Sequence, residues 1–482
     1  MTNTSKKTSS VMGKGILYLT SSKIIFAVSA FLMHIGLARI LGVEDYGVYG
    51  VIMAFLGITY TLFQPGVQTS VIKFAAEDIS RVSLVLKAGV KLQLILSVTL
   101  TLLIFAAAPL IAFFLKDDSL ISYIRLASLV IIPAALDTVY LASLNGIRFF
   151  GQQAISVIFH SLTKLFLVFI IIFLGFRVKG VLAGMIASTI IGMIISRSFC
   201  KFKNEGGEFG IKKLLIFTTP VLLYVFCVTS IASLDLLFVK SLLNSNKEAG
   251  LYTSAANISK LPFILFSSFQ AVLLPSVSRA FSMNNMELFK KYINQTLRYL
   301  LLLMLPIVTI LSATAGTVLE IFYSSKYSGA ESALSILLFG GAFSIILSVL
   351  ASVIIGCGRP KVSLFFALIL FPMDIILNLI LIPIYGLSGA AISTTITFIS
   401  GSIMAGAYIY YNFGALMEVL SFLKISLASA IVYIISIKYS ITGILIFGEY
   451  LILFIVYFLL LLLFREIKKE DIQMLRDTVR TA

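Results

Sequence analysis

Basic side chains stand inside long apolar stretches of this chain, where a charge is costly. Lys164 and Lys260 lie near the centres of two such stretches, and Lys23 lies a third of the way along the first. A lysine near the bilayer centre costs about 2.5 to 3.5 kcal/mol on insertion, so it is expected to face protein or water and to have a function. His160 precedes Lys164 by four residues and shares its helical face. With Arg39, these side chains predict a cationic floor for binding an anion.

Each of these residues also has a structural interpretation. The long stem of Lys23 would let its ammonium group reach the aqueous interface. Arg39 lies at the outer end of its stretch and is equally well placed as an interfacial anchor. Lys164 and Lys260 lie too deep for either role, but both could pair with an embedded acid. The sequence leaves these alternatives open.

One embedded carboxyl has polar neighbours of its own. Asp374 lies near the middle of an apolar stretch, between Pro372 and Asn378. A proline leaves carbonyl groups free and the amide adds an oxygen, so the segment predicts a site for a coupling ion, H⁺ or Na⁺. The alternatives are a salt bridge and a protonated, hydrogen-bonded carboxyl. The other embedded acids are Asp137, Glu449 and Asp235, and Asp235 is expected to pair locally with Lys240.

Catalytic and cofactor motifs are absent from the sequence. It contains no glycine-rich phosphate loop, no HExxH motif and no acid pair in a soluble loop. The cysteines (Cys200, Cys227 and Cys357) are scattered, and neither histidine has a Cys or an acid at ligand spacing. We therefore expect no metal site, no cofactor, no disulfide framework, no ATP hydrolysis and no enzymatic activity.

The elements that position these residues follow from hydropathy. Hydrophobic residues make up 59% of the 482 residues and charged residues 12%, with a mean hydropathy of +1.06, so lipid must be the solvent. Unpaired backbone groups are costly in hydrocarbon and these runs are too long for barrel strands, so the fold class is an all-α polytopic membrane protein. We predict about 14 transmembrane helices, near residues 15–40, 48–70, 92–115, 122–144, 152–175, 179–199, 215–239, 249–275, 295–318, 331–355, 362–385, 387–410, 421–438 and 442–464. The 10 prolines lie inside or at the rim of these spans, and several are expected to mark kinks.

The distribution of basic residues orients the spans. Most of the 37 Lys and Arg residues lie at the N-terminus, in the connections after even-numbered spans and in the C-terminal tail. The positive-inside rule then places both termini in the cytoplasm, in a plasma or inner membrane. The same asymmetry accounts for most of the net charge of +16, so we expect a bilayer and no nucleic acid as partner.

Three local matches indicate an internal repeat. Residues 44–49 (EDYGVY) resemble residues 247–252 (KEAGLY), the segment from Leu141 to Arg148 resembles that from Leu350 to Arg359, and residues 184–189 resemble residues 389–394. Six spans separate the two copies in each match, which predicts two six-helix lobes in a parallel pseudo-two-fold repeat, followed by an appended helix pair. The predicted units are an N-terminal lobe (1–200), a cytoplasmic linker (201–214), a C-terminal lobe (215–410), the appended pair (411–464) and a cytoplasmic tail (465–482).

The repeat also carries a family resemblance. Residues 37–42 (LARILG), followed by Tyr46 and Gly47, resemble the first-loop signature of polysaccharide flippases in the multidrug/oligosaccharidyl-lipid/polysaccharide exporter superfamily. Residues 378–391 (NLILIPIYGLSGAA) resemble the matching signature between spans eleven and twelve, and residues 250–252 (GLY) are similar too. The resemblance covers essentially the whole chain.

This resemblance implies a V-shaped flippase that moves polyprenyl-linked oligosaccharide or polysaccharide repeat units from the cytoplasmic to the outer leaflet by alternating access. The basic residues would then grip the lipid's diphosphate. The appended pair is similar to that of peptidoglycan-precursor flippases, where it forms a groove for the lipid tail. The implied partners are the lipid-linked sugar, the bilayer, H⁺ or Na⁺, and glycan-assembly proteins.

The sequence leaves two alternative functions open. The first is a drug or metabolite exporter of the same superfamily, coupled to Na⁺ or H⁺. An exporter of organic cations would need net acid in its cleft, whereas the embedded lysines favour an anionic load. The second is a membrane-embedded glycan polymerase or ligase. Such enzymes generally carry a large external loop with catalytic residues, and the external connections predicted here are short.

Overall fold

The computed structural model describes residues 2–202, 209–439 and 443–467, and part of the predicted linker at 201–214 and most of the predicted tail lie outside these ranges. Every regular element in the described residues is a helix, which confirms the predicted fold class. The chain forms two compact units, Met1–Gly250 and Leu251–Ala482. The boundary between the two units falls within the helix Asn246–Ser259.

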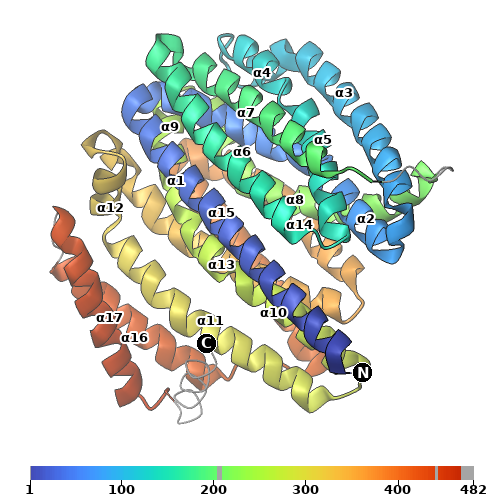
Figure 1. Ribbon diagram of the computed structural model, residues 1–482. Helices are drawn as coiled ribbons and strands as arrows, with labels where there is room; N and C mark the ends of the chain where they lie inside the picture. Colours follow the sequence, from blue (N-terminus) through green and yellow to red (C-terminus); the bar gives the residue numbers. More distant parts are fainter. Residues whose placement is uncertain (1, 203–208, 440–442, 468–482) are drawn as a thin grey trace. The chain divides into compact units, whose positions relative to one another are not determined.

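The first unit holds the helices of the first six predicted spans and the seventh (Figure 1). Its elements are α1 (Thr2–Thr61), α2 (Gln64–Glu77), η1 (Ile79–Arg81), α3 (Val82–Phe114), α4 (Leu120–Ser128), α5 (Ile131–Gly146), α6 (Phe150–Ile171), η2 (Ile172–Phe176), α7 (Arg177–Phe199), α8 (Ile211–Leu243) and the start of α9 (Asn246–Ser259).

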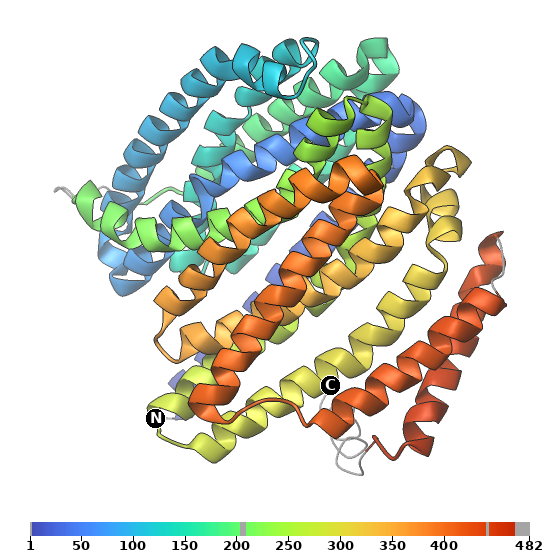
Figure 2. The same ribbon diagram turned by 180° about the vertical axis from the view of Figure 1, so that it is seen from behind.

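The second unit continues α9 and ends with the appended pair (Figure 2). Its elements are α10 (Leu261–Ser282), α11 (Met286–Ala313), α12 (Ala315–Phe322), η3 (Ser325–Ala330), α13 (Glu331–Gly356), α14 (Pro360–Tyr385), α15 (Leu387–Phe413), α16 (Val419–Lys438), η4 (Gly443–Leu445) and α17 (Ile446–Leu463).

Twelve segments of the described chain are long and apolar enough to cross a membrane. Two of them, Tyr18–Thr61 and Phe150–Phe199, each contain parts of two predicted spans. The backbone leaves the helical conformation inside both, at Gly42 (φ 77°, ψ 174°) and at Gly175 (φ 91°). These left-handed values favour glycine, which has no side chain to clash there. Separating the segments at these glycines gives the predicted number of about 14.

Several predicted spans are broken where the sequence indicated one continuous helix. The span predicted at 48–70 breaks between α1 and α2, and the one at 249–275 breaks at Lys260, between α9 and α10. In both, a proline occupies the first turn of the following helix, where its missing N–H costs nothing. A break frees carbonyl groups, and the buried amide of Gln93 donates to one of them, Phe63 O, at 3.3 Å.

Within each unit, small residues let one pair of helices pack closely, and the two pairs correspond under the repeat. α7 carries one at every fourth position and packs against α6, and α15 does the same against α14. A Cβ on Gly192 would lie 2.9 Å from the ring of His160, and one on Gly401 would lie 2.7 Å from Leu370. The two stripes are Gly180, Gly184, Ser188, Gly192 and Ser196 in α7, and Gly389, Ser393, Thr397 and Gly401 in α15.

Buried polar contacts fix the appended pair to α11, beside which Figure 2 shows it. Arg298 of α11 donates through Nε to Glu466 Oε1 at 2.8 Å, and Ser421 of α16 donates to the same oxygen at 2.6 Å. Further along α11, Tyr457 donates to the carbonyl of Leu302 at 2.9 Å. Near its end, the hydroxyls of Tyr450 and Thr314 lie 2.6 Å apart. We call these four contacts the α11 ladder.

Substitution of Glu466 by Ala should loosen the appended pair. Arg298 is 5% exposed, and it would lose its carboxylate partner without regaining water. Removing one partner of a buried ion pair typically costs about 3 to 5 kcal/mol. We expect a marked loss of thermal stability in detergent, measured by unfolding monitored with a thiol-reactive dye. Glu418→Ala, at an exposed glutamate just before α16, is the matched control. Equal melting of the two variants would contradict a stabilising role for the ion pair.

Candidate functional site

Two of the predicted site residues, His160 and Lys164, lie on the side of α6 away from its exposed apolar residues. The exposed residues of α6 form one stripe, spaced by three or four positions: Ile155, Phe159, Leu162, Phe166 and Ile170. At 100° per residue, His160 and Lys164 lie on the opposite side of the helix, and both side chains are half-buried. They therefore face protein, whereas the stripe is suited to lipid.

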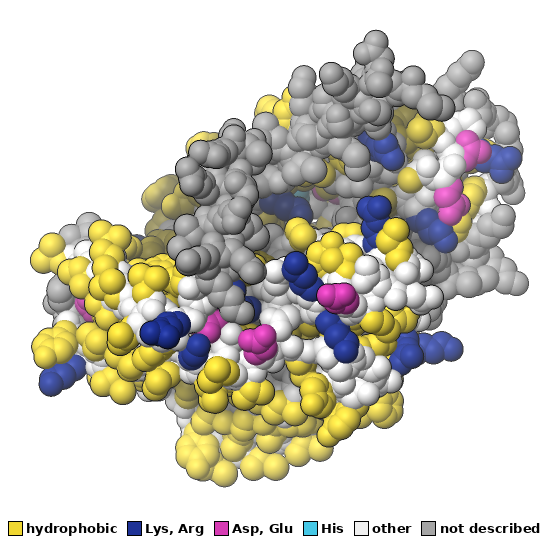
Figure 3. All heavy atoms as spheres, turned by 90° about the horizontal axis from the view of Figure 1, so that it is seen from below, with side chains coloured by type: hydrophobic (Ala, Val, Ile, Leu, Met, Phe, Trp, Pro, Cys, Tyr) yellow, Lys and Arg dark blue, Asp and Glu magenta, His cyan; other side chains and the backbone are white. Residues whose placement is uncertain are grey.

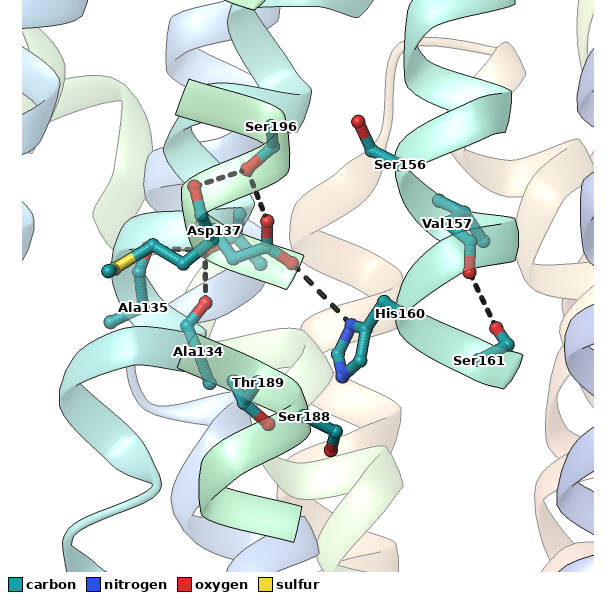
Figure 4. A network of polar contacts seen from close by, with 12 residues as sticks. Ala134, Ala135, Asp137, Ser156, Val157, His160, Ser161, Ser188, Thr189 and Ser196 are labelled. Atoms are coloured by element: carbon teal, nitrogen blue, oxygen red, sulfur yellow. Dashed lines mark hydrogen bonds and ion pairs between the residues drawn. The ribbon is translucent and has the colours of Figure 1, made fainter. Parts of the chain in front are cut away.

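His160 lies close to Asp137, which the sequence indicated only as one of several embedded carboxyls. Its Nδ1 lies 3.8 Å from Asp137 Oδ2, and Ser196 donates to Asp137 Oδ1 at 2.6 Å (Figure 4). The three residues come from α6, α5 and α7. The role of Ser196 was missed, although it continues the small-residue stripe of α7.

Lys164 has a different environment from His160, which lies one helical turn before it. Within the described residues it makes no ion pair and no hydrogen bond, so pairing with an embedded acid is not found.

The register of α1 against α6 places Lys23 relative to Lys164. Tyr18 lies beside Gly151, and Phe169 lies beside Gly36. Both pairs are separated by 133 residues, so the two helices run parallel and Lys23 is level with residue 156. At 1.5 Å per residue it lies about 12 Å before Lys164 along the helix axis. Lys23 is exposed.

Arg39 and Lys260 are both exposed, and each lies next to a break in its helical segment. Arg39 is exposed near the end of the first part of α1, just before Gly42. Lys260 belongs to the second unit, where it is the exposed N-cap residue of α10 at the break in its span. Pro262, one of the prolines expected to mark kinks, lies in the first turn of α10 directly after Lys260, and the candidate membrane span Asn246–Ser282 continues across this break.

The predicted ion site of the second unit is fully buried and richly bonded. The side-chain amide of Asn378 donates to Asp374 O at 2.9 Å and to Asp374 Oδ2 at 3.1 Å. From α15, Thr397 donates to Asp374 Oδ1 and Ser393 to Asp374 O, both at 3.2 Å. Sequence reasoning missed both hydroxyls as site residues, although they lie in the small-residue stripe of α15.

One atom of this site has no partner. Asn378 Oδ1 is buried and accepts no hydrogen bond. Together with the carboxylate and hydroxyl oxygens, it offers the hard oxygen ligands that suit a small cation, or acceptors for a proton. Within the described part of the chain, no three His, Cys, Asp or Glu side chains form a group that could hold a metal ion.

Comparison with known families decides the classification. The family described as polysaccharide biosynthesis protein matches residues 36–332. The chain belongs to this family. It is 22% identical to the lipid II flippase MurJ of Bacillus subtilis, with 78% of each chain covered. It is 23% identical to the "Probable low-salt glycan biosynthesis flippase Agl15" of Haloferax volcanii, covering 77% of this chain and 78% of that one.

A solved structure shares the fold of this polysaccharide biosynthesis family member. The structure is lipid II flippase MurJ in an inward closed conformation, with a TM-score of 0.76 and 19% sequence identity. The match covers 95% of this chain and 99% of that chain. At this identity the likeness establishes the fold alone, and it agrees with the predicted polytopic helical architecture.

The Gly-x-Tyr motifs of this family member, identified above as copies of a repeat, lie against each other. A Cβ on Gly47 would lie 1.9 Å from Asn246 O, and a Cβ on Gly250 would lie 1.9 Å from Val43 O. The repeat offset of 203 residues relates Gly47 to Gly250 and Val43 to Asn246, so the two contacts are equivalent under the repeat. We call this backbone contact of residues 43–47 with residues 246–250 the α1/α9 crossing.

A buried ion pair lies next to the crossing. Lys240 Nζ donates to Asp117 Oδ2 at 2.8 Å, and the amide of Asn246 donates to the same oxygen at 3.3 Å. The expected pairing of Lys240 with Asp235 was wrong, since a residue distant in sequence supplies the partner. Burial by itself would raise the pKa of the Asp117 carboxyl, but hydrogen bonds from Lys240, Ser119 and Asn246 outweigh it and hold the pKa below its ordinary value.

Substitution of Gly47 by Ala should separate the α1/α9 crossing. The new methyl group would overlap the backbone of α9, and overpacking typically costs about 1 to 3 kcal/mol. We expect faster amide hydrogen exchange at residues 43–50 and 244–252, by about tenfold, measured by mass spectrometry. Gly57→Ala is the control, because its Cβ would meet only Ser233 Oγ at 3.8 Å. Unchanged exchange in Gly47→Ala would show that the contact is not tight.

Proposed function

We propose that this chain is a flippase that carries polyprenyl-linked oligosaccharide or polysaccharide repeat units from the cytoplasmic to the outer leaflet by alternating access. Membership of the polysaccharide biosynthesis protein family and relatives named as flippases support the proposal. The observation that carries it is Lys164, a cation inside a membrane-spanning segment that faces protein and has no acid partner among the described residues.

The chemistry of Lys164 fits the phosphates of such a lipid. An ammonium group held within hydrocarbon and left without a carboxylate is costly, so its presence implies an anion that binds there. A diphosphate supplies several charged acceptors and forms strong charge-assisted hydrogen bonds. Lysine is a mobile point charge, which suits a load that must later be released. Lys23, His160, Lys260 and Arg39 are proposed as further contacts along the lipid's path.

The charge of the helix ends supports the proposed orientation. In the second unit, the end where α11, α14 and α16 begin carries far more basic residues than the opposite end, where Lys326 and Lys438 lie. Figure 3 views this basic end and shows Lys and Arg side chains spread across it, with fewer Asp and Glu. Under the positive-inside rule it faces the cytoplasm of a plasma or inner membrane. The basic residues at this end are Arg279, Lys290, Lys291, Arg359, Lys361, Lys424 and Arg465.

This orientation gives the α1/α9 crossing a place in the proposed cycle. The crossing follows the first span, so it would lie on the outer side of the membrane. There it would close the route to the outer leaflet while the substrate site is reached from the cytoplasm. Release outside would then require the crossing and the Asp117–Lys240 ion pair to open.

Asp374 is proposed as the site of a coupling ion, H⁺ or Na⁺. Its carboxyl group and the unpartnered Asn378 Oδ1 lie together in the core of the second unit. Binding of a cation would satisfy both, and its loss would leave a carboxylate in a low-dielectric interior. Such a site would let an ion gradient bias the conformational cycle.

The phosphate grip is tested by the double variant Lys164→Gln/Lys260→Gln. Hydrogen bonds to charged groups contribute about 1.5 to 3 kcal/mol each, so we expect delivery of the lipid-linked sugar to fall at least about tenfold at equal membrane abundance. Delivery is measured by access of an externally added glycan-modifying enzyme to the sugar in vesicles. Lys201→Gln/Lys326→Gln, at exposed lysines in connections, is the control. Normal delivery by the first variant would refute the phosphate grip.

Asp374→Asn tests ion coupling separately. The variant keeps the shape and most hydrogen bonds of the site but removes the charge that would bind a cation. We expect translocation in proteoliposomes to lose its response to imposed H⁺ and Na⁺ gradients. Asp118→Asn, at an exposed aspartate, should keep that response. A full gradient response in Asp374→Asn would exclude this carboxyl as the coupling site.

A further inference from the structure

Asp137 of α5 is a second buried carboxyl, in a membrane-spanning segment of the first unit. The residue is 6% exposed. Two groups approach its oxygens: the hydroxyl of Ser196 at 2.6 Å from Oδ1 and the imidazole of His160 at 3.8 Å from Oδ2 (Figure 4). None of these three residues belongs to the ion site around Asp374.

The contacts are too few for an isolated carboxylate. A carboxylate has acceptor sites for about four hydrogen bonds, and among the described residues a single hydroxyl donates to Asp137. The 3.8 Å separation from His160 is longer than a hydrogen bond, so a neutral imidazole does not supply the missing donor. In a low-dielectric interior, a carboxylate with so few partners is stable only with a positive charge close to it or with a proton bound to it.

The charged and titratable side chains of the helices around Asp137 indicate which cation could bind to it. On α6, Lys164 lies one turn beyond His160, and on α7 the exposed Arg197 follows Ser196. Burial, and secondly the charge of Asp137, raise the pKa of the nearby Cys200 thiol to about 12, so that thiol stays neutral. No charged side chain of α2 or α3 is recorded against Asp137 in the described residues. One carboxyl and one hydroxyl are too few ligands for a metal ion, but they suffice for a proton.

We propose that Asp137 and His160 form a proton-binding site, and that proton uptake there strengthens anion binding at Lys164. In the unprotonated state, the negative charge of Asp137 lies near the face that Lys164 and His160 share, and it opposes an incoming phosphate. A proton on Asp137 removes that charge, and a proton on His160 compensates it. The linkage to a phosphate rests on the proposed function, whereas the proton site itself does not.

The proton site can be tested on the purified protein without transport. The chain has two histidines, so a His34→Gln variant with isotope-labelled histidine and a histidine-free affinity tag reports His160 alone by NMR. We expect the pH midpoint of the His160 signal to move by about one pH unit when Asp137→Asn removes the neighbouring charge. Asp374→Asn should leave the midpoint unchanged. If the pH midpoint of the His160 signal is the same with and without the Asp137→Asn substitution, the proposal is overturned.

The linkage is tested by binding of a polyprenyl diphosphate to protein in nanodiscs. We expect affinity to rise about tenfold from pH 7.5 to pH 5.5 in the native chain, and the rise to be much smaller in Asp137→Asn. Asp118→Asn removes an exposed carboxyl outside the site and should retain the rise, which separates the charge of Asp137 from a general effect of losing a carboxylate. Equal pH dependence in native and Asp137→Asn protein would overturn the linkage. A pH-linked His160 in a protein that moves no lipid-linked sugar would refute the proposed function but not the proton site.

Discussion

Hydrocarbon offers no hydrogen-bond partner, and the rest of this structure follows from that constraint. Each polar group within a span must find its partner in the protein. Gln93 therefore bonds a carbonyl freed by a helix break, and Arg298 is held by Glu466. Several buried polar atoms of the described residues have no hydrogen-bond partner, among them Asn378 Oδ1 and Gln93 Oε1, and the Lys164 ammonium makes no ion pair or hydrogen bond within the described residues. We propose that Lys164 and Asn378 Oδ1 lack protein partners because a ligand binds to each of them during transport.

Periodicity and hydropathy predicted most of the architecture, because crossing the bilayer depends on local composition. The spans, their approximate number and the local pair Asp374 and Asn378 could be found this way, since residues four apart on a helix are neighbours. The contacts of Asp137 with His160 and Ser196, and of Lys240 with Asp117, join three helices or distant segments. Such contacts depend on how helices pack, which a single sequence does not encode locally. Pro262 predicts a kink in its apolar run, but the sequence does not show that one helix ends at Lys260 and another begins after it.

The two copies of the repeat pack their fifth spans in the same way, but these spans carry different polar residues. α6 and α14 are the fifth spans of the two copies, and each packs against a helix with small residues at every fourth position. The protein-facing side of α6 carries His160 and Lys164, whereas α14 carries Asp374 and Asn378. Duplicated helices thus present a basic face in one unit and an acidic one in the other. The proposed transport of an anionic lipid coupled to a cation would use both faces.

The α11 ladder has a mechanical consequence. α17 is bonded to the middle of α11 at Leu302 and to Thr314 just after its end, and Glu466 joins Ser421 of α16 to Arg298 of α11, so the three helices form one stiff body. The appended helices expose many large apolar side chains, so any tilt of α11 must also displace the lipid around them. The energy of that displacement depends on bilayer thickness and on the packing of acyl chains. The lipid composition of the membrane would thereby set part of the barrier to each conformational change.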